Sequence, residues 1–297
     1  MVIHPRRFDQ VLNDAMGGLA RIWRSLLIPA VAVSVPVSIA TIVAFGATGG
    51  ADLLDLVLND PGRLRTIPEE VFWELARPFY VAVGIAALLQ MIGGVFVALA
   101  SHASVAAELH GEPLTAGEAT REAMRRYPTA FGAALVILGA VLALIGLGAT
   151  IWLIPIVSVG TPNSTTALVA VLLLGALLGP GIWAAVSVSM TTSAVAIEHG
   201  GVFGSILRSL RLVRGRWWPT AGFLMLVGLL GGIAIPLIQL IALPLAALGG
   251  GGSALTVASG LGVLAQGLLV AAISAMYTYW YIDLRARKEG LSTDDLG

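Results

Sequence analysis

Very few residues in the apolar stretches of this chain could do chemistry. The strongest polar groups there are three intramembrane glutamines, Gln90, Gln239 and Gln266. A hydrogen bond between neutral side chains of membrane helices contributes about 0.6 to 2 kcal/mol. We therefore interpret the glutamines as contacts between helices, with the lining of a transport pathway as the alternative. The chain has no cysteine, which excludes disulfides, thiolate metal sites and a cysteine nucleophile.

Three histidines lie where they could contribute to a site. His102 stands near the inner end of an apolar stretch, and we interpret it as a residue at headgroup level, with a functional buried group as the alternative. His110 and His199 each follow an acid and precede a glycine. The two pairs could hold a metal ion, but a cation at a helix C-terminus explains the same residues. We predict no metal, no cofactor and no catalytic residue, and therefore no enzyme.

Arginines gather in the segments between the apolar stretches. The clearest segment is Phe203–Pro219, in which Ile206, Leu210, Val213 and Trp217 recur at helical spacing. It predicts an amphipathic helix that lies flat on a membrane. The residues predicted to contact anionic lipid are Arg24, Arg125, Arg126, Arg208, Arg211, Arg214 and Arg216, and the predicted interfacial anchors are Trp23, Tyr127, Trp217, Trp218 and Trp280. As the alternative, the arginines only set topology and pair with Glu198, Asp283 or Glu289.

The elements that position these residues are membrane helices. Of 297 residues, 57% are hydrophobic and 11% charged, against about 25% charged in soluble domains. Six apolar stretches reach the roughly 20 residues that a spanning helix needs. They cover about 26–48, 79–104, 129–157, 166–196, 220–248 and 254–282. The sequence thus predicts an all-α polytopic membrane protein, and its net charge of zero argues against nucleic acid as a partner.

One unit recurs three times along the chain. Gly111, Gly200 and Gly290 follow the even-numbered stretches at separations of 89 and 90 residues, each shortly after an acid. Two arginines, Arg126 and Arg216, precede odd-numbered stretches and are also 90 residues apart. Each unit is expected to be an interfacial helix followed by a transmembrane hairpin. We predict one membrane domain over 1–297, with repeats at about 7–111, 112–200 and 201–290 and a polar tail at 291–297.

The orientation follows from the distribution of basic residues. Fourteen of the 17 Lys and Arg residues lie at the two termini or in the connections 102–127 and 198–216. The other three lie in the loop 49–78, which also carries six acids. Because cytoplasmic segments carry the excess of Lys and Arg, we predict that both termini are cytoplasmic. Within that loop, the spacing of Thr66 and Glu69 predicts a capping box at the start of a short helix.

The segment SILRSLRLVRGRWWP and the C-terminal YIDLRARKEGL resemble bacterial, largely actinobacterial, membrane proteins named after the membrane domain of glycerophosphoryl diester phosphodiesterases. The resemblance covers the last third well and the rest only in layout. It implies a plasma-membrane location and a six-helix architecture, but no agreed activity. The soluble phosphodiesterase barrel is missing, because Glu198-His-Gly-Gly201 is a helix-end element of the repeat.

These residues favour a non-enzymatic membrane module, such as a scaffold, an accessory subunit or a sensor of the cell envelope. Its expected partners are anionic lipids of the inner leaflet and other membrane proteins. The alternative function is a transporter or permease subunit for a lipid or apolar small molecule. Prolines in the predicted spans, such as Pro36, Pro180 and Pro236, support this alternative because broken helices line transport pathways.

Overall fold

A computed structural model describes residues 8–49, 53, 56, 60, 62–63, 66–159, 164–198, 200–247 and 252–290. Its helices are α1 (Phe8–Arg21), α2 (Trp23–Thr48), α4 (Glu69–His110), α5 (Ala116–Val159), α6 (Ser164–Val188), α7 (Thr191–Glu198), α8 (Val202–Val213), α9 (Trp217–Ala247) and α10 (Gly252–Glu289). Six described segments are long and apolar enough to cross a membrane: Trp23–Thr48, Glu69–His110, Ala116–Thr150, Gly175–Glu198, Trp217–Leu237 and Gly260–Glu289. The predicted all-α fold with six candidate spans is confirmed.

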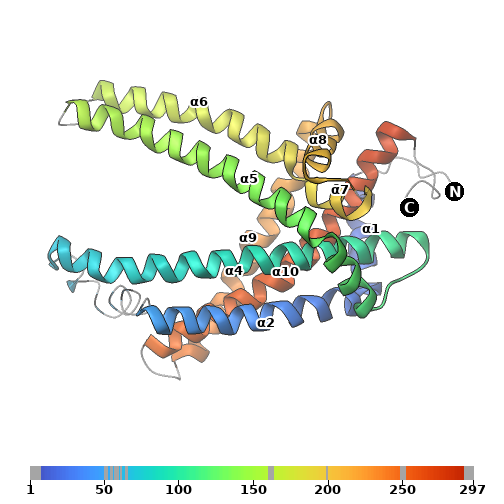
Figure 1. Ribbon diagram of the computed structural model, residues 1–297, viewed down its shortest axis with the longest axis horizontal. Helices are drawn as coiled ribbons and strands as arrows, with labels where there is room; N and C mark the ends of the chain where they lie inside the picture. Colours follow the sequence, from blue (N-terminus) through green and yellow to red (C-terminus); the bar gives the residue numbers. More distant parts are fainter. Residues whose placement is uncertain are drawn as a thin grey trace.

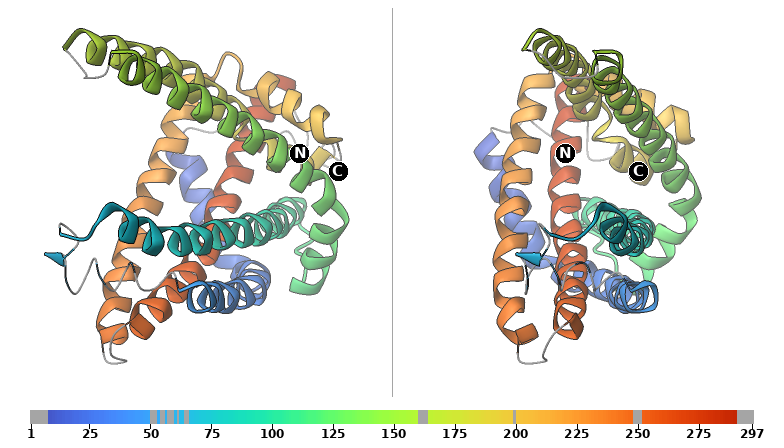
Figure 2. Two further views of the ribbon diagram at one scale, coloured as in Figure 1. Left: turned by 60° about the vertical axis from the view of Figure 1, so that its left-hand side comes forward. Right: turned by 90° about the vertical axis from the view of Figure 1, so that its left-hand side faces the viewer.

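The short helices gather at one end of the molecule. Figure 1 shows α1, α7, α8 and the C-terminal end of α10 at this end, while the end of α5 adjoins the start of α6 and the end of α9 adjoins the start of α10 at the other. The α5–α6 hairpin diverges from α4, and Figure 2 shows the α9–α10 hairpin inclined to α2 and α4. The long helices therefore fan out from a common base that contains the short ones.

The helices α2, α4 and α10 form the centre of the fan, with α9 packed on α10. Ala30, Val97 and Ala271 from the three central helices are buried together. A side chain at Gly267 of α10 would collide with Ser34 of α2, because its Cβ would lie 1.7 Å from Ser34 Oγ. Small residues thus let the central helices approach closely, as is typical between membrane helices.

The outer faces of the long helices are apolar and exposed. Ile145 on α5, Leu172 on α6 and Met225 on α9 are 62%, 63% and 79% exposed. Such extensive exposure of large aliphatic side chains is rare in proteins surrounded by water, and it fits a hydrocarbon environment.

Several helix boundaries differ from the predicted ones. The interfacial helix expected before the third stretch is not separate but forms the first part of α5. Thr115 and Glu118 form a capping box at its start, with Thr115 N donating to Glu118 Oε2 at 2.8 Å. The capping box predicted at Thr66 is absent. Pro68 occupies the N-cap of α4 without a side-chain hydrogen bond, and Thr66 Oγ1 donates to the Arg63 carbonyl at 2.9 Å.

Candidate functional site: the surface-helix layer

The most elaborate polar structure of the described chain is the layer formed by α1, α7, α8 and the adjoining ends of α4, α5 and α10, which we call the surface-helix layer. Its central element is α8, which begins after Gly201 and ends before Gly215, whose φ of 85° reverses the chain direction. Lys288 Nζ of α10 donates to the carbonyls of Arg211 and Arg214. A cation therefore caps the C-terminus of α8, where the helix dipole favours positive charge.

The two faces of α8 have different neighbours. Ser205, Ser209 and Leu212 are buried against the protein. On the opposite face Phe203 and Leu207 are 69% and 54% exposed. This differs from the predicted membrane-facing stripe, because Val213 of that stripe is buried in the protein. The helix thus packs on the protein through two serines and the core residues Leu212 and Val213, and it leaves the large apolar side chains of Phe203 and Leu207 uncovered.

Four charged side chains join α7, α8 and α10. Arg208 of α8 lies 2.6 Å from Glu198 Oε2 and 2.5 Å from Glu289 Oε1. Arg285 of α10 lies 3.1 Å from Glu198 Oε1 and 3.2 Å from Glu289 Oε2. The Tyr281 hydroxyl also donates to Glu198. Because two guanidinium groups face two carboxylates, this four-residue ion cluster is neutral and fixes the three helices to one another.

The surroundings of Arg208 favour the charged form of its guanidinium group. Burial lowers the pKa of its guanidinium, but the hydrogen bond and the charge of Glu198 raise the pKa more, so the net shift is upward. Arg208 was predicted to contact anionic lipid. In the structure its charge is already neutralised by two carboxylates, which is the alternative that the sequence left open.

A second ionic contact holds α1 in the layer. Glu108 at the end of α4 accepts a hydrogen bond from Arg21 Nε at 2.6 Å and from the Tyr279 hydroxyl at 2.9 Å. Gly18 of α1 makes room for this contact, because a Cβ there would lie 1.8 Å from the Tyr279 hydroxyl oxygen. Glu108 therefore connects α1, α4 and α10.

Arg126 plays the corresponding part between α5 and α7. Its Nε lies 2.5 Å from Glu122 Oε1, and its Nη1 donates to the carbonyls of Val195, at 3.2 Å, and Ala196. Arg125, one residue earlier, has a side chain that is 75% exposed. Of this predicted lipid-contacting pair, Arg126 is thus used inside the protein and Arg125 faces outward.

The fourth span is interrupted inside this layer. Helix α6 ends at Val188 and α7 begins at Thr191, where the sequence had predicted one span over 166–196. The hydroxyl of Ser209, which is fully buried on α8, donates to the Ser187 carbonyl at 2.7 Å and accepts from the Met190 N–H at 3.1 Å. One side chain thus satisfies two backbone groups that the break leaves without helical partners.

The last two turns of α10 pass through the centre of the layer. Residues 279–286 are all buried, including Asp283 and Arg285. Trp280, predicted to be an interfacial anchor, is 4% exposed, stacks on Phe223 with ring centroids 4.8 Å apart and donates to Thr220 Oγ1 at 3.3 Å. The structure places it inside the protein because α1, α8 and α9 all pack around this end of α10.

The other predicted surface residues lie at or near the outside of the layer. Arg24, Arg211, Arg214 and Arg216 are exposed. Trp23 and Trp218 are 49% and 80% exposed. Tyr127 and Trp217 are half-buried, and they donate to the carbonyls of Ile92 and Trp183 at 3.0 and 3.2 Å.

Two of the three intramembrane glutamines contact each other. Gln90 Nε2 of α4 donates to Gln266 Oε1 of α10 at 2.8 Å, beside a cavity of about 40 Å³. The side chain of Gln239 in α9 lies outside the described part of the structure. The contact corresponds to the helix-contact interpretation, and the cavity has room for little more than one water molecule.

The histidines differ from the expected arrangement. His102, predicted at headgroup level, is buried, and its Nδ1 lies 2.7 Å from Thr278 Oγ1 of α10. Because Thr278 provides a hydrogen-bond partner for the imidazole, His102 can be buried away from the polar headgroup region. His110 Nδ1 is 2.6 Å from the Ala106 carbonyl of its own helix, while His199 lies outside the described residues. No cluster of three or more potential metal ligands occurs among the residues that the structure describes.

The sequence reasoning missed Ser209, Tyr281 and Arg285 as parts of this site. Ser209 has no sequence signal, because a serine on an arginine-rich helix is expected to face water. Glu198 and Glu289 stand out in the sequence because they recur before the spaced glycines. Their partners Arg208 and Arg285 depend on how α7, α8 and α10 pack, which the sequence does not show.

A family model described as a domain of unknown function (DUF7847) matches residues 69–284. Comparison with curated proteins found no match, and comparison with solved structures found none either. The match extends from the start of α4 into the buried end of α10.

Proposed function

Because the chain belongs to the DUF7847 family, whose description assigns no activity, we propose its function from its geometry: it is a non-enzymatic membrane module whose surface-helix layer rests on an anionic membrane surface. The observation that carries the proposal is the outer face of α8. Phe203 and Leu207 are exposed there, and Arg211, Arg214 and Arg216 are exposed at its end. An apolar face bordered by arginines is typical of helices that lie in a lipid interface.

The strength of this contact can be stated from the exposed charges. A basic residue near an anionic membrane surface contributes about 1 kcal/mol before screening by salt. Arg208 is excluded because its charge is paired with Glu198 and Glu289. The three exposed arginines then contribute about 3 kcal/mol together. This is enough to orient α8, whose other face is fixed to α7 and α10 by the ion cluster.

The proposal includes a location and an orientation. We infer that the protein resides in the plasma membrane of a bacterium, with both termini and the surface-helix layer in the cytoplasm. Support comes from the basic residues, which gather in the segments that form this layer. We also infer that the chain consists of three units. Gly111 and Gly290 cap α4 and α10 with φ of 84° and 62°, as expected of equivalent helix ends.

The DUF7847 description gives no support to the resemblance to the membrane domain of glycerophosphoryl diester phosphodiesterases. We therefore base no activity on that resemblance. A scaffold, an accessory subunit and an envelope sensor are the forms of module that the layer suits, because each needs a fixed cytoplasmic face for other membrane proteins.

The transporter alternative has weaker support. A pathway through the centre of the fan would pass the Gln90–Gln266 pair and the cavity beside it. The two amides contact each other, and the cavity of about 40 Å³ is smaller than the 300–1,000 Å³ typical of small-molecule sites.

The proposal is tested by a probe on α8. The chain has no cysteine, so Leu207→Cys can carry a single polarity-sensitive fluorophore on the exposed face. In nanodiscs we expect a more apolar environment for the dye with anionic lipid than with zwitterionic lipid. The difference should shrink as salt rises, because exposed charges are screened.

A matched pair of variants separates the site from general charge effects. Arg211→Gln with Arg214→Gln should reduce the lipid dependence of the probe. Arg63→Gln with Arg77→Gln, which removes the same charge from two exposed positions before and within α4, should leave it unchanged. Equal dye signals in anionic and zwitterionic nanodiscs would refute the electrostatic contact.

A further inference from the structure

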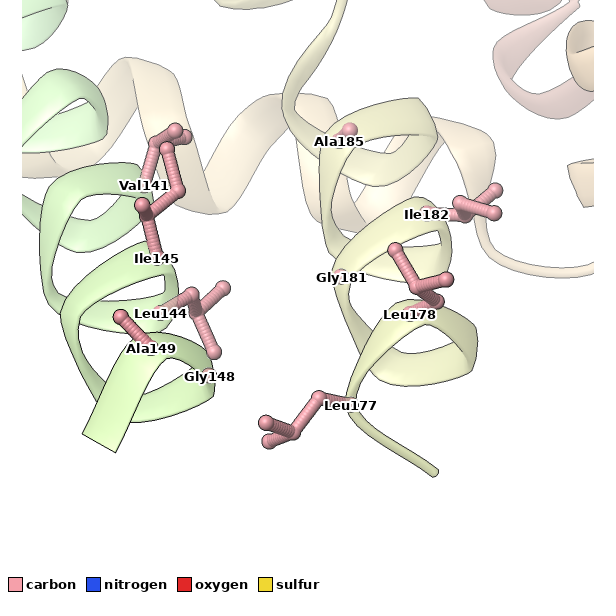
Figure 3. Close-up of a pocket in the computed structure, with 10 residues that line it drawn as sticks. All are labelled: Val141, Leu144, Ile145, Gly148, Ala149, Leu177, Leu178, Gly181, Ile182 and Ala185. Atoms are coloured by element: carbon pink, nitrogen blue, oxygen red, sulfur yellow. The ribbon is translucent and has the colours of Figure 1, made fainter. Parts of the chain in front are cut away.

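The α5–α6 hairpin contains a cavity of about 660 Å³ between its two helices. Figure 3 shows that Leu144 of α5 and Leu177 of α6 point into this gap from opposite sides. All of the lining residues are aliphatic or glycine: Val141, Leu144, Ile145, Gly148, Ala149, Leu177, Leu178, Gly181, Ile182 and Ala185. The cavity lies between residues 141–149 of α5 and 177–185 of α6.

Water is a poor occupant of this space. A stable buried water makes two to four hydrogen bonds to polar partners, and none of these side chains carries a polar group. An empty gap would leave the aliphatic walls without dispersion contacts on one side. The cavity therefore requires an apolar occupant.

We propose that the gap between α5 and α6 binds the hydrocarbon chain of a membrane lipid. The volume lies within the range of small-molecule sites, and the gap is open on its outer side, where Ile145 and Ile182 are 62% and 56% exposed. Small residues on both walls, Gly148 and Ala149 on α5 and Gly181 and Ala185 on α6, provide the width. Because the surroundings of the hairpin are exposed aliphatic side chains such as Ile145 and Leu178, the chain can enter from the lipid phase.

A helix of a second copy fits the gap less well. The lining of α5 extends over nine residues, from Val141 to Ala149. A helix is rigid and about 10–12 Å wide, so it needs a straight groove of that width over this length, whereas a flexible hydrocarbon chain adapts to the walls that it meets.

The site is tested with the full-length protein in proteoliposomes that contain phosphatidylglycerol with a photoreactive group on one acyl chain. We expect labelling of 141–149 and 177–185 above that of the exposed face of α9, represented by Met225 and Leu229. That face is in contact with bulk lipid and serves as an internal reference.

Filling the cavity should remove the label. A side chain at Gly181 meets nothing within 4 Å, so Gly181→Phe extends into open space. We expect about a tenfold fall in labelling of the hairpin relative to α9, since each displaced methylene contributes about 0.8 kcal/mol. Gly175→Phe on the same helix is the control, because Gly175 is equally free of neighbours but does not line the cavity.

A second filling variant with its own control keeps the test valid if Gly181→Phe fails to fold. Ala149→Phe fills the gap from the other wall, and Gly146→Phe, also without neighbours within 4 Å, is its control. The proposal is overturned if hairpin labelling equals that of α9 or survives both filling variants. It is also overturned if Leu178→Cys cross-links two copies through the gap, because a protein helix is then the occupant.

Discussion

Ser209→Ala should destabilise the protein through the backbone of a different helix. The Ser209 hydroxyl donates to the Ser187 carbonyl and accepts from the Met190 N–H at the break between α6 and α7. A buried polar group left without a partner costs about 1–3 kcal/mol. Since the substitution leaves two such groups, we expect a loss of about 2–4 kcal/mol in the free energy of unfolding.

Ser205→Ala is the matched control for this experiment. Ser205 lies one turn earlier on the same buried face of α8, with 1% of its surface exposed against 0% for Ser209. Its hydroxyl has no hydrogen-bond partner among the described residues. Removing a buried hydroxyl that makes no hydrogen bond relieves a desolvation cost. We therefore expect Ser205→Ala to be neutral or to stabilise by about 1 kcal/mol.

Thermal unfolding in a mild detergent, followed by tryptophan fluorescence, compares the two variants. At about 2–4 °C per kcal/mol, Ser209→Ala should lower Tm by about 5 °C or more, while Ser205→Ala should not lower it. Hydrogen exchange gives a local readout, because the Met190 amide should exchange faster only in Ser209→Ala. Equal effects of the two substitutions would refute the reasoning, since burial and volume are the same at both positions.

Two further predictions concern topology and the intramembrane amides. In intact cells Gly62→Cys, in the loop before α4, should react with an impermeant maleimide. Arg214→Cys, at the exposed end of α8, should react only after permeabilisation, and its labelling from outside would reverse the proposed orientation. Gln90→Leu should cost about 1–2 kcal/mol in unfolding free energy by leaving Gln266 without its partner, and Gln90→Leu with Gln266→Leu should recover most of it. A double variant as unstable as the single one in thermal unfolding would show that the amides act separately.

The spans could be predicted because they depend on composition over 20 or more residues. The six predicted stretches correspond to six described helical segments with the required length and hydropathy. Their ends were harder to predict. Helix α5 continues through Pro128, where a boundary was expected, and α6 stops at Val188 without a proline or glycine there. The second boundary depends on a hydroxyl from α8, which local sequence does not reveal.

The sequence predicted a helix over Phe203–Pro219, and the structure has α8 over Val202–Val213, with a different exposed face from the predicted one. The pattern of Ile206, Leu210 and Val213 indicates where apolar residues gather on a helix, without saying whether protein or lipid covers them. In the structure Phe203 and Leu207 face outward, and the protein side of α8 combines the core residues Leu212 and Val213 with a polar contact. The polar contact is Ser209 at the break in the neighbouring span.

The ion cluster has a sequence signal that can be argued from helix electrostatics. Glu108, Glu198 and Glu289 each lie in the last turn of a helix, where the dipole disfavours negative charge. An acid at such a position needs a cation nearby, and in the structure Glu108 lies beside Arg21 while Glu198 and Glu289 lie beside Arg208 and Arg285. An acid in the last turn of each of these three helices therefore predicts an ion pair at each helix end. Arginines of the surface helices are their nearest partners, so some of these arginines are engaged by the protein before lipid is considered.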